Sequence, residues 1–177
     1  PMPDAFVRAL ALVKAAAAVV NGHLGLLDRP RADAIMEAAT EVAGGAHADQ
    51  FPIDRYQTGS GTSSNMNANE VIAHLAARAS SLAVHPNDHV NLGQSSNDVV
   101  PTAIRVMAVV EARRALLPAL AHLRKAIDKR AKALGKSVKT GRTHLMDAMP
   151  LSFAQELGAW SAQLSSAQAR IEDSLKR

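Results

Sequence analysis

The sequence predicts an all-α protein, and two observations support that prediction. Hydrophobic residues make up 47% of the 177-residue chain, yet aromatic residues make up only 3%. Alanine is abundant, and this mixture suits closely packed helices better than a β-sandwich, in which aromatic and β-branched residues are enriched. Apolar residues also recur at helical spacing through most of the chain. We expect a small helical domain over residues 1–95, followed over residues 96–177 by the first long helices of a central helical bundle.

Two helices are predicted at the start of the chain. Across Asp4–Val20, apolar side chains recur every three or four residues, and Asn21-Gly22 follows as a stop. Asp28 and Pro30 are typical of a helix start, and Gly44-Gly45 ends the second apolar pattern. We expect these two helices to form a hairpin that carries no chemistry.

The composition then changes to a run of glycines and small hydroxyl residues, Thr58–Ser64, which we call the first polar segment. A helix follows it, and Asn67 and Glu70 have the spacing of a capping box at its start. Small donors on a flexible backbone just before a helix N-terminus can hold an anion. A glycine- and serine-rich surface loop is the alternative reading of this segment. The buried side of the helix is expected to consist of Val71, Ile72, Leu75, Ala76 and Ala79.

A turn is predicted at His85-Pro86-Asn87-Asp88, because proline presets φ and the Asn and Asp side chains bond to nearby backbone. His85 and His89 are four residues apart, but Pro86 argues against the helix that a metal pair at this spacing would need. No metal site is expected. The second polar segment, Gly93–Asp98, comes next, and Pro101 is expected to open the helix that follows it.

Two long helices are expected in the second half of the chain. From Pro101 to Leu134 apolar residues lie on most sides of the predicted helix, as in a bundle interior, and Pro118 is expected to kink or break it. A heptad seam begins after Pro150. Both helices need more apolar partners than 177 residues provide. We therefore expect oligomerisation through them, further bundle helices in a larger subunit, or both. The seam consists of Phe153, Leu157, Trp160, Leu164, Ala167, Ile171 and Leu175.

The third polar segment, Gly141–Asp147, lies between these two helices and contains an imidazole. Thr143 offers a hydroxyl that can donate and accept, and His144 has an unperturbed pKa near neutrality. Each polar segment is expected to lead into a helix, so each offers neutral donors and the positive end of a helix dipole. The chain has no G-x-x-x-x-G-K-[ST] phosphate motif. The pattern therefore favours a ligand with more than one carboxylate.

Composition argues against several other classes of protein. The net charge of +4 comes from scattered basic residues, and one Tyr, one Trp and three Phe offer little for base stacking, so no nucleic-acid partner is expected. The chain has no cysteine, which leaves no disulfide and no thiolate site. The apolar run Ala9–Val20 is short and contains Lys14, so we expect neither a membrane span nor a signal peptide. A cytoplasmic location is the expectation.

Three long blocks of the chain resemble, in order, blocks of the fumarase/aspartase superfamily, and the resemblance covers essentially the whole chain. Within the superfamily the chain is most similar to the class II fumarases. His144 follows Gly141-Arg142-Thr143, as in fumarases, whereas aspartases carry Gln there. Ser95-Ser96-Asn97-Asp98 is also fumarase-like, because aspartases have Ser-Thr-Asn-Asp. The three blocks are Thr58–Glu70, His85–Asp98 and Gly141–Ala148.

The resemblance implies reversible hydration of fumarate to L-malate, a step of the tricarboxylic acid cycle, by a cofactor-free homotetramer with a central helical bundle. It implies that Ser60, Gly61 and Thr62 hold a carboxylate of the small dicarboxylate substrate. Thr143 would contact substrate, and His144 would exchange a proton. Ser95, Ser96 and Asn97 would hold substrate and the reacting water. His85, Pro86, Asn87 and Asp88 correspond to a second, peripheral dicarboxylate site, although Leu82 stands where that site usually has a basic residue.

Some of the family's active-site segments have no counterpart in this sequence. A mobile Gly-Ser-Ser loop followed by Met-Pro, Lys and Asn is missing, and so is the acidic partner that would orient His144. The chain is therefore expected to be a fragment of a fumarase that is inactive by itself. An aspartate ammonia-lyase of the same superfamily and a non-catalytic helical oligomerisation module are the alternatives.

Overall fold

A computed structural model describes residues 1–176. The expected all-α fold is confirmed, with a single two-stranded hairpin as the β structure of the described residues. They form two compact units, Pro1–Ala108 and the residues from Val109 on. The units divide within a helix, and the domain boundary expected after residue 95 stays a prediction. In chain order the elements are α1 (Asp4–His23), α2 (Arg29–Ala43), η1 (Ala48–Gln50), α3 (Thr62–Ser80), η2 (Pro86–Val90), α4 (Ser96–Glu111), η3 (Ala112–Leu116), α5 (Leu117–Leu134), β1 (Val138–Thr143), β2 (Met146–Ser152) and α6 (Phe153–Ser174).

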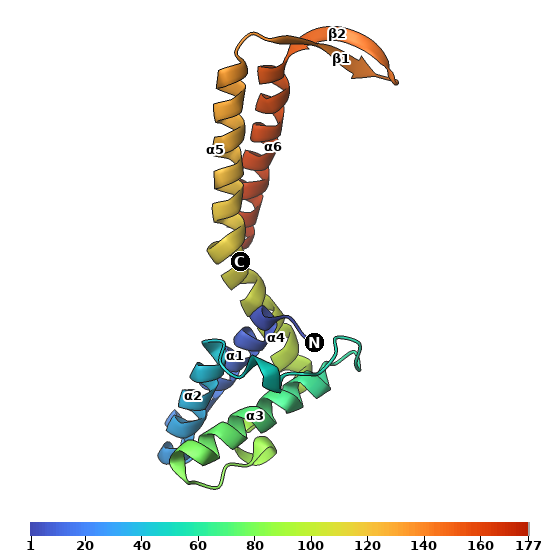
Figure 1. Cartoon of the computed structure of the whole chain (residues 1–177). Coiled ribbons are helices and arrows are strands. Elements are labelled where there is room, and N and C mark those ends of the chain that lie inside the picture. The colour runs from blue at the N-terminus through green and yellow to red at the C-terminus, as the bar shows by residue number, and fades with distance from the viewer. Residues whose placement is uncertain (177) are drawn as a thin grey trace. The chain divides into compact units, whose positions relative to one another are not determined.

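The first unit is built on the hairpin of α1 and α2, which packs against α3 (Figure 1). The expected start of α2 is confirmed, because the Asp28 side chain accepts a hydrogen bond from the backbone N–H of Arg31 and Pro30 lies in the first turn. Small residues let these helices approach closely, so a small number of large apolar side chains fills the space between the helices. The largest buried apolar side chains are Phe6, Leu10, Ile35, Val42, Ile72 and Val90.

By length and composition alone, α1 could cross a membrane. Its apolar side, which includes Phe6 and Leu10, is however buried in the first unit. A core helix passes the same test of length and composition as a membrane span. Packing thus accounts for part of the apolar character of α1, whereas Leu12, Val19 and Val20 of the same helix are exposed.

A lysine lies in this apolar core. Lys14 on α1 has no exposed surface, and its Nζ donates hydrogen bonds of 2.9 Å to Asn91 Oδ1 and of 2.9 Å to Gln94 Oε1. Burial lowers the pKa of Lys14 to about 7, because removing the ammonium group from water disfavours its charged form. The two amide oxygens compensate part of the lost hydration.

Helix α3 begins six residues earlier than the capping-box pattern predicted, with Gly61 as its N-cap. Gly61 has a φ of 67°, in the left-handed region, and a Cβ at this position would lie 2.9 Å from Val100 Cγ1. Gln57 supplies the capping acceptor instead, since its Oε1 accepts from Ser64 N at 3.1 Å. The prediction of a start at Asn67 was therefore wrong: Asn67 lies within the helix, where its side chain donates to the carbonyl of Gln50.

The next helix also begins earlier than expected. Helix α4 starts at Ser96, and Pro101, which was predicted to open it, lies inside it. Ser95 precedes the first turn, and its Oγ accepts a hydrogen bond from Asn97 N at 3.3 Å. The helix ends at Glu111 and is followed by the π-helical turn η3, after which Pro118 occupies the first turn of α5. The expected interruption near Pro118 is therefore present.

The second unit is a pair of helices, α5 and α6, joined by the hairpin of β1 and β2 (Figure 1). The sequence predicted a third polar segment that leads into a helix at Pro150, and this was wrong. Pro150 lies in β2, and α6 begins only at Phe153. Ser152 and Gln155 form a complete capping box there, which fixes the helix start.

Gly61→Ala is expected to lower the free energy of unfolding of the chain by about 2 kcal/mol or more. An alanine in the left-handed region costs about 1–2 kcal/mol, and the contact of its Cβ with Val100 adds an overpacking cost. Gly59→Ala is the matched control, because its Cβ would meet no atom within 4 Å. Urea unfolding followed by circular dichroism measures both, and equal stabilities of the two variants would contradict this account of Gly61.

Lys14→Met is expected to change the pH dependence of stability. Above about pH 7 the folded chain leaves Lys14 unprotonated, whereas the unfolded chain keeps the proton up to its ordinary pKa of 10.5. The unfolded state then binds more protons, so the stability of the original chain rises with pH relative to the variant. The expected slope is about 1.4 kcal/mol per pH unit between about pH 7.5 and 9.5. Below about pH 6 both states are protonated, and the slope vanishes.

Urea unfolding of the original chain and of Lys14→Met at a series of pH values measures this difference, because the other titrating groups are the same in both chains. A stability difference that is independent of pH from 6 to about 9.5 would show that the amine titrates normally in the folded chain.

Candidate active site

The first polar segment forms the N-terminus of α3. Ser60 Oγ and Thr62 Oγ1 are 2.8 Å apart, and Thr62 is the first residue of the helix. The first N–H groups of a helix have no acceptor within the helix, and Gln57 satisfies that of Ser64. Hydroxyl groups and the positive end of a helix dipole thus lie together at this point, which is an arrangement suited to a carboxylate.

The second polar segment forms the N-terminus of α4 in the same unit. Ser95 and Asn97 are exposed, and Ser96 is half-buried. Ser96 Oγ accepts a hydrogen bond of 3.0 Å from Asn65 Nδ2. Because that oxygen already accepts from an amide, the hydroxyl hydrogen of Ser96 remains available to donate to an anion.

Asn65 joins the first and second polar segments. It follows the first segment directly, lies in the first turns of α3, and is almost fully buried. Its Nδ2 bonds both Ser96 Oγ and Asn91 Oδ1, the latter at 3.2 Å. The contact of Gly61 with Val100 joins the same two helices a second time. Two helix N-termini that carry hydroxyl groups are therefore joined through a buried side chain.

The third polar segment is the tip of the hairpin in the second unit. His144 and Leu145 form a two-residue turn with φ values of 50° and 62°, and Thr143 pairs with Met146 beside them. Positive φ at both central residues is the pattern of a type I′ hairpin turn. Thr143 and His144 are both exposed. An imidazole at such a tip can reach a ligand that lies against the hairpin.

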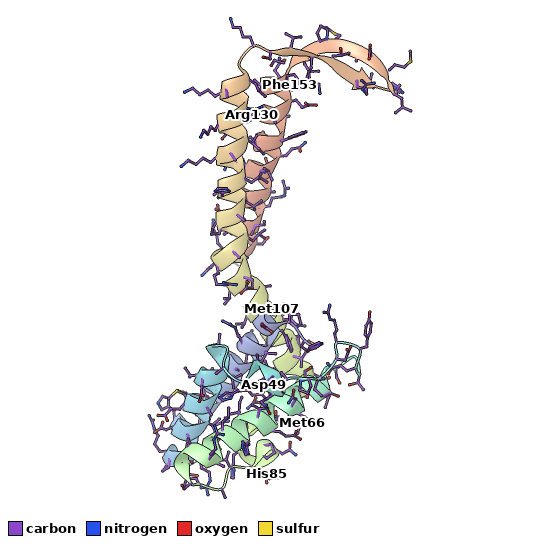
Figure 2. All side chains as sticks on the ribbon, viewed as in Figure 1. Asp49, Met66, His85, Met107, Arg130 and Phe153 are labelled. Atoms are coloured by element: carbon purple, nitrogen blue, oxygen red, sulfur yellow. The ribbon has the colours of Figure 1, made fainter. Side chains whose placement is uncertain are left out.

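The hairpin is held by close backbone packing and by contacts with α6. A Cβ on Gly141 would collide with the backbone carbonyl oxygen of Met149, so this position requires glycine. At the base, Lys139 Nζ lies 2.9 Å from the Glu156 carboxylate and 5.6 Å from the centre of the Phe153 ring. Figure 2 shows Phe153 at the start of α6, next to the hairpin. The base of the hairpin, whose turn carries His144, is therefore attached to the long helix α6.

The candidate residues divide between the two compact units. Ser60, Gly61, Thr62, Ser95, Ser96 and Asn97 belong to the first unit, and Thr143 and His144 belong to the second. Asn65, which directly follows the first polar segment, bonds Ser96 of the second polar segment. The meeting of all three segments around one ligand stays a prediction.

The peripheral candidates lie in the turn η2, with His85 as its N-cap. His85 Nδ1 accepts from Asp88 N at 3.2 Å and lies 3.2 Å from Asp88 Oδ2. His85 N donates to His89 Nδ1 at 2.8 Å. These bonds order the turn internally, and a dicarboxylate site at His85, Pro86, Asn87 and Asp88 stays a prediction. Within residues 1–176, no group of three or more histidine or acidic side chains is placed to hold a metal ion.

The sequence reasoning missed the side chains that hold the polar segments in place. Gln57 caps α3, Asn65 bonds Ser96, and Asn91 and Gln94 bond Lys14. One signal was present, because a lone lysine in the apolar run of α1 needs either solvent or buried acceptors. Asn65, Asn91 and Gln94 gave no comparable signal, since the partners named here are 31 to 80 residues away in the chain.

The chain is similar in sequence to curated fumarate hydratases. It is 67% identical over 176 residues to a class II fumarate hydratase of Xylella fastidiosa (strain 9a5c), and the match covers 99% of this chain and 37% of that protein. It is 52% identical over 174 residues to class II fumarate hydratase 2 of Pseudomonas aeruginosa, with 98% of this chain and 38% of that protein covered.

Among solved structures, the class II fumarase of Schistosoma mansoni superposes with a TM-score of 0.91 at 42% identity. That match covers 98% of this chain and 38% of the other. The chain thus spans well under half the length of the relatives it matches. The family described as Lyase matches residues 2–177, and the chain therefore belongs to this lyase family.

Proposed function

We propose that this chain contributes part of the active site of a class II fumarate hydratase, which adds water to fumarate to give L-malate and catalyses the reverse reaction. The observation that carries the proposal is the contact between the first and second polar segments through Asn65 and Ser96. It joins two helix N-termini, each with hydroxyl groups, and a helix N-terminus favours the binding of an anion such as a carboxylate. The similarity to curated fumarate hydratases over 99% of the chain supports the same reaction.

The chemistry makes fixed donors the main requirement. Dehydration of malate removes a proton from the carbon next to a carboxylate, and the resulting carbanion delocalises its charge into that carboxylate. Preorganised donors stabilise such charge, and one donor is typically worth about 2.7–4 kcal/mol in oxyanion sites. Under this proposal Ser60, Gly61 and Thr62 bind one substrate carboxylate. Ser95, Ser96 and Asn97 bind the substrate and the reacting water.

Acid–base catalysis at oxygen is assigned to His144. In hydration it accepts a proton from water, and in dehydration it donates one to the leaving hydroxide; such catalysis typically contributes about 10²–10⁴-fold. Thr143 contacts substrate beside it. The exposed hairpin turn supports this role, because the imidazole is accessible and its backbone is held by the turn. The base that removes the carbon-bound proton is not assigned to a residue of this chain.

Exposed apolar side chains on the second unit support association into a homo-oligomer, which we propose to be a tetramer. The proposal also includes that the enzyme uses no cofactor and lies in the cytoplasm. Leu145 is 94% exposed and Met149 is 84% exposed on the hairpin, and Trp160 on the predicted heptad seam is 51% exposed. Large apolar side chains exposed to this extent are expected to be covered by another chain where they form a continuous patch. The division into a domain of residues 1–95 and a bundle from residue 96 belongs to this proposal.

The experiment that tests the function uses a chimera, because the chain matches 37% of the Xylella protein's length. This chain replaces the matching residues of that fumarate hydratase, and absorbance of fumarate measures its formation from malate and from aspartate. Turnover of malate alone supports the proposal. Turnover of aspartate alone would indicate an ammonia-lyase, and turnover of neither would leave the chain as a helical association module. The isolated chain is expected to show no turnover.

In that chimera, His144→Gln is expected to lower kcat for malate dehydration by about 10²-fold or more, with a modest change in KM. A group that acts mainly in the transition state affects kcat more than substrate binding. His23→Gln, at the exposed end of α1, is the matched control. Near-normal turnover of the His144 variant would remove this residue from the mechanism.

Thr62→Ala is expected to raise KM and lower kcat together, because the hydroxyl binds the carboxylate in both ground state and transition state. Thr40→Ala is the control, since Thr40 is an exposed residue of α2 whose hydroxyl bonds the Met36 carbonyl. Steady-state kinetics of the chimera measure both variants. Unchanged constants for Thr62→Ala would make the first polar segment a surface loop.

A further inference from the structure

The second polar segment is held from inside the protein by a buried lysine. Lys14 lies on α1, and it reaches Asn91 and Gln94, which are 77 and 80 residues further along the chain. Both distances from Nζ to the amide oxygens are 2.9 Å. These contacts join α1 to the residues that immediately precede Ser95 and Ser96.

The two amides that accept from Lys14 hold the backbone of this segment with their nitrogens. Asn91 Nδ2 donates to the carbonyl of Gln94 at 3.1 Å, and Gln94 Nε2 donates to the carbonyl of Val90 at 2.9 Å. The amine fixes the orientation of each amide, because a flipped amide would place its NH₂ group against another donor. Lys14 and the two backbone carbonyls therefore together determine which way both amides point.

The same network continues to Ser96. Asn91 Oδ1 accepts from Lys14 and also from Asn65 Nδ2, and Asn65 Nδ2 bonds Ser96 Oγ as well. A path of three hydrogen bonds thus runs from the amine of Lys14, through Asn91 and Asn65, to the hydroxyl oxygen of Ser96. The Oδ1 atom of Asn65 has no hydrogen-bond partner among the described residues, so the Nδ2 atom of Asn65 carries this path. Hydrogen bonds between buried polar groups restrict the movement of the groups they join.

Packing alone does not account for Lys14. An apolar side chain of similar length, such as methionine, would fill the same space without the cost of burying an amine. Asn21, about two turns further along the same helix, also bonds this region, since its Nδ2 donates to the carbonyl of Leu92 at 3.0 Å. Helix α1 therefore presents two polar side chains to residues 91–94.

We propose that Lys14 is a positioning residue, which holds the second polar segment through Asn91 and Gln94 so that Ser96 presents its hydroxyl hydrogen to the substrate. The proposal rests on the proposed function in one respect, namely that Ser96 binds substrate. The hold of Lys14 on the segment is independent of that assignment. The two parts are therefore tested separately.

The first test measures local order in the chain itself. Lys14→Met removes the donors, and Leu10→Ala is the matched control, because Leu10 is a buried residue of the same helix that makes no part of the network. Hydrogen exchange of residues 90–98, followed by mass spectrometry under native conditions, is compared with exchange in α2. We expect exchange of residues 90–98 to be about tenfold faster or more in Lys14→Met. In Leu10→Ala, exchange should change evenly across α2 and residues 90–98.

The second test measures catalysis in the chimera with the Xylella sequence. Lys14→Met is expected to lower kcat/KM for malate by about 10- to 100-fold, because a misplaced donor weakens transition-state binding. Leu10→Ala should keep kcat/KM near the original value at a temperature where both variants are folded. Circular dichroism at the assay temperature verifies that condition.

The outcomes separate the two proposals. If the exchange of residues 90–98 relative to that of α2 were the same in the two variants, the hold of Lys14 on the segment would be overturned, whatever the activity. Faster exchange with unchanged kcat/KM would show that Lys14 orders the segment without serving the reaction, and would overturn its positioning role. A chimera that is inactive with the original chain would overturn the proposed function, while the exchange comparison would still decide the structural part.

Discussion

The hydrogen bond between Asn65 and Ser96 is the contact on which the candidate site depends. It connects the first turns of α3 and α4, which carry the first and second polar segments. Hydrophobic packing between alanine-rich helices is non-directional, and it leaves freedom for one helix to slide or rotate against another. A directional bond in a buried setting removes that freedom, so two helix N-termini keep a fixed relation.

This arrangement places polar side chains inside a small apolar core, which costs folding free energy. Lys14, Asn65 and Asn69 are buried among apolar side chains, and the Oδ1 atoms of both asparagines have no hydrogen-bond partner among the described residues. An unsatisfied buried carbonyl typically costs about 1–3 kcal/mol. Proteins keep such groups where they fix a geometry that packing cannot fix, and here the network ends at a hydroxyl of the candidate site.

In the second unit, rigidity has a different origin. The turn at His144 and Leu145 has positive φ at both positions, and Gly141 admits the close approach of the opposite strand. Lys139 and Glu156 then join the base of the hairpin to α6. The backbone that carries the exposed imidazole is thus held by the turn and by the base of the hairpin, which is consistent with the proton exchange proposed for His144.

The sequence determined the helices, the start of α2 at Asp28 and the interruption before Pro118, because periodicity and local capping are written in neighbouring residues. It also indicated the three polar segments. It did not determine the starts of α3, α4 and α6. Asn67 and Pro101 matched local start signals, but Gln57 caps Ser64 and the hydroxyl of Ser95 accepts from Asn97, and both helices begin earlier.

The hairpin and the buried network were decided by tertiary structure alone. A His-Leu turn lacks the Asn-Gly or Asp-Gly signal of a two-residue hairpin, so the paired strands were not visible in the sequence. Lys14 and Asn91 are 77 residues apart, and no local pattern relates them. Short-range preferences are set by adjacent residues, whereas a buried hydrogen bond between distant residues exists only after the chain has folded and excluded water.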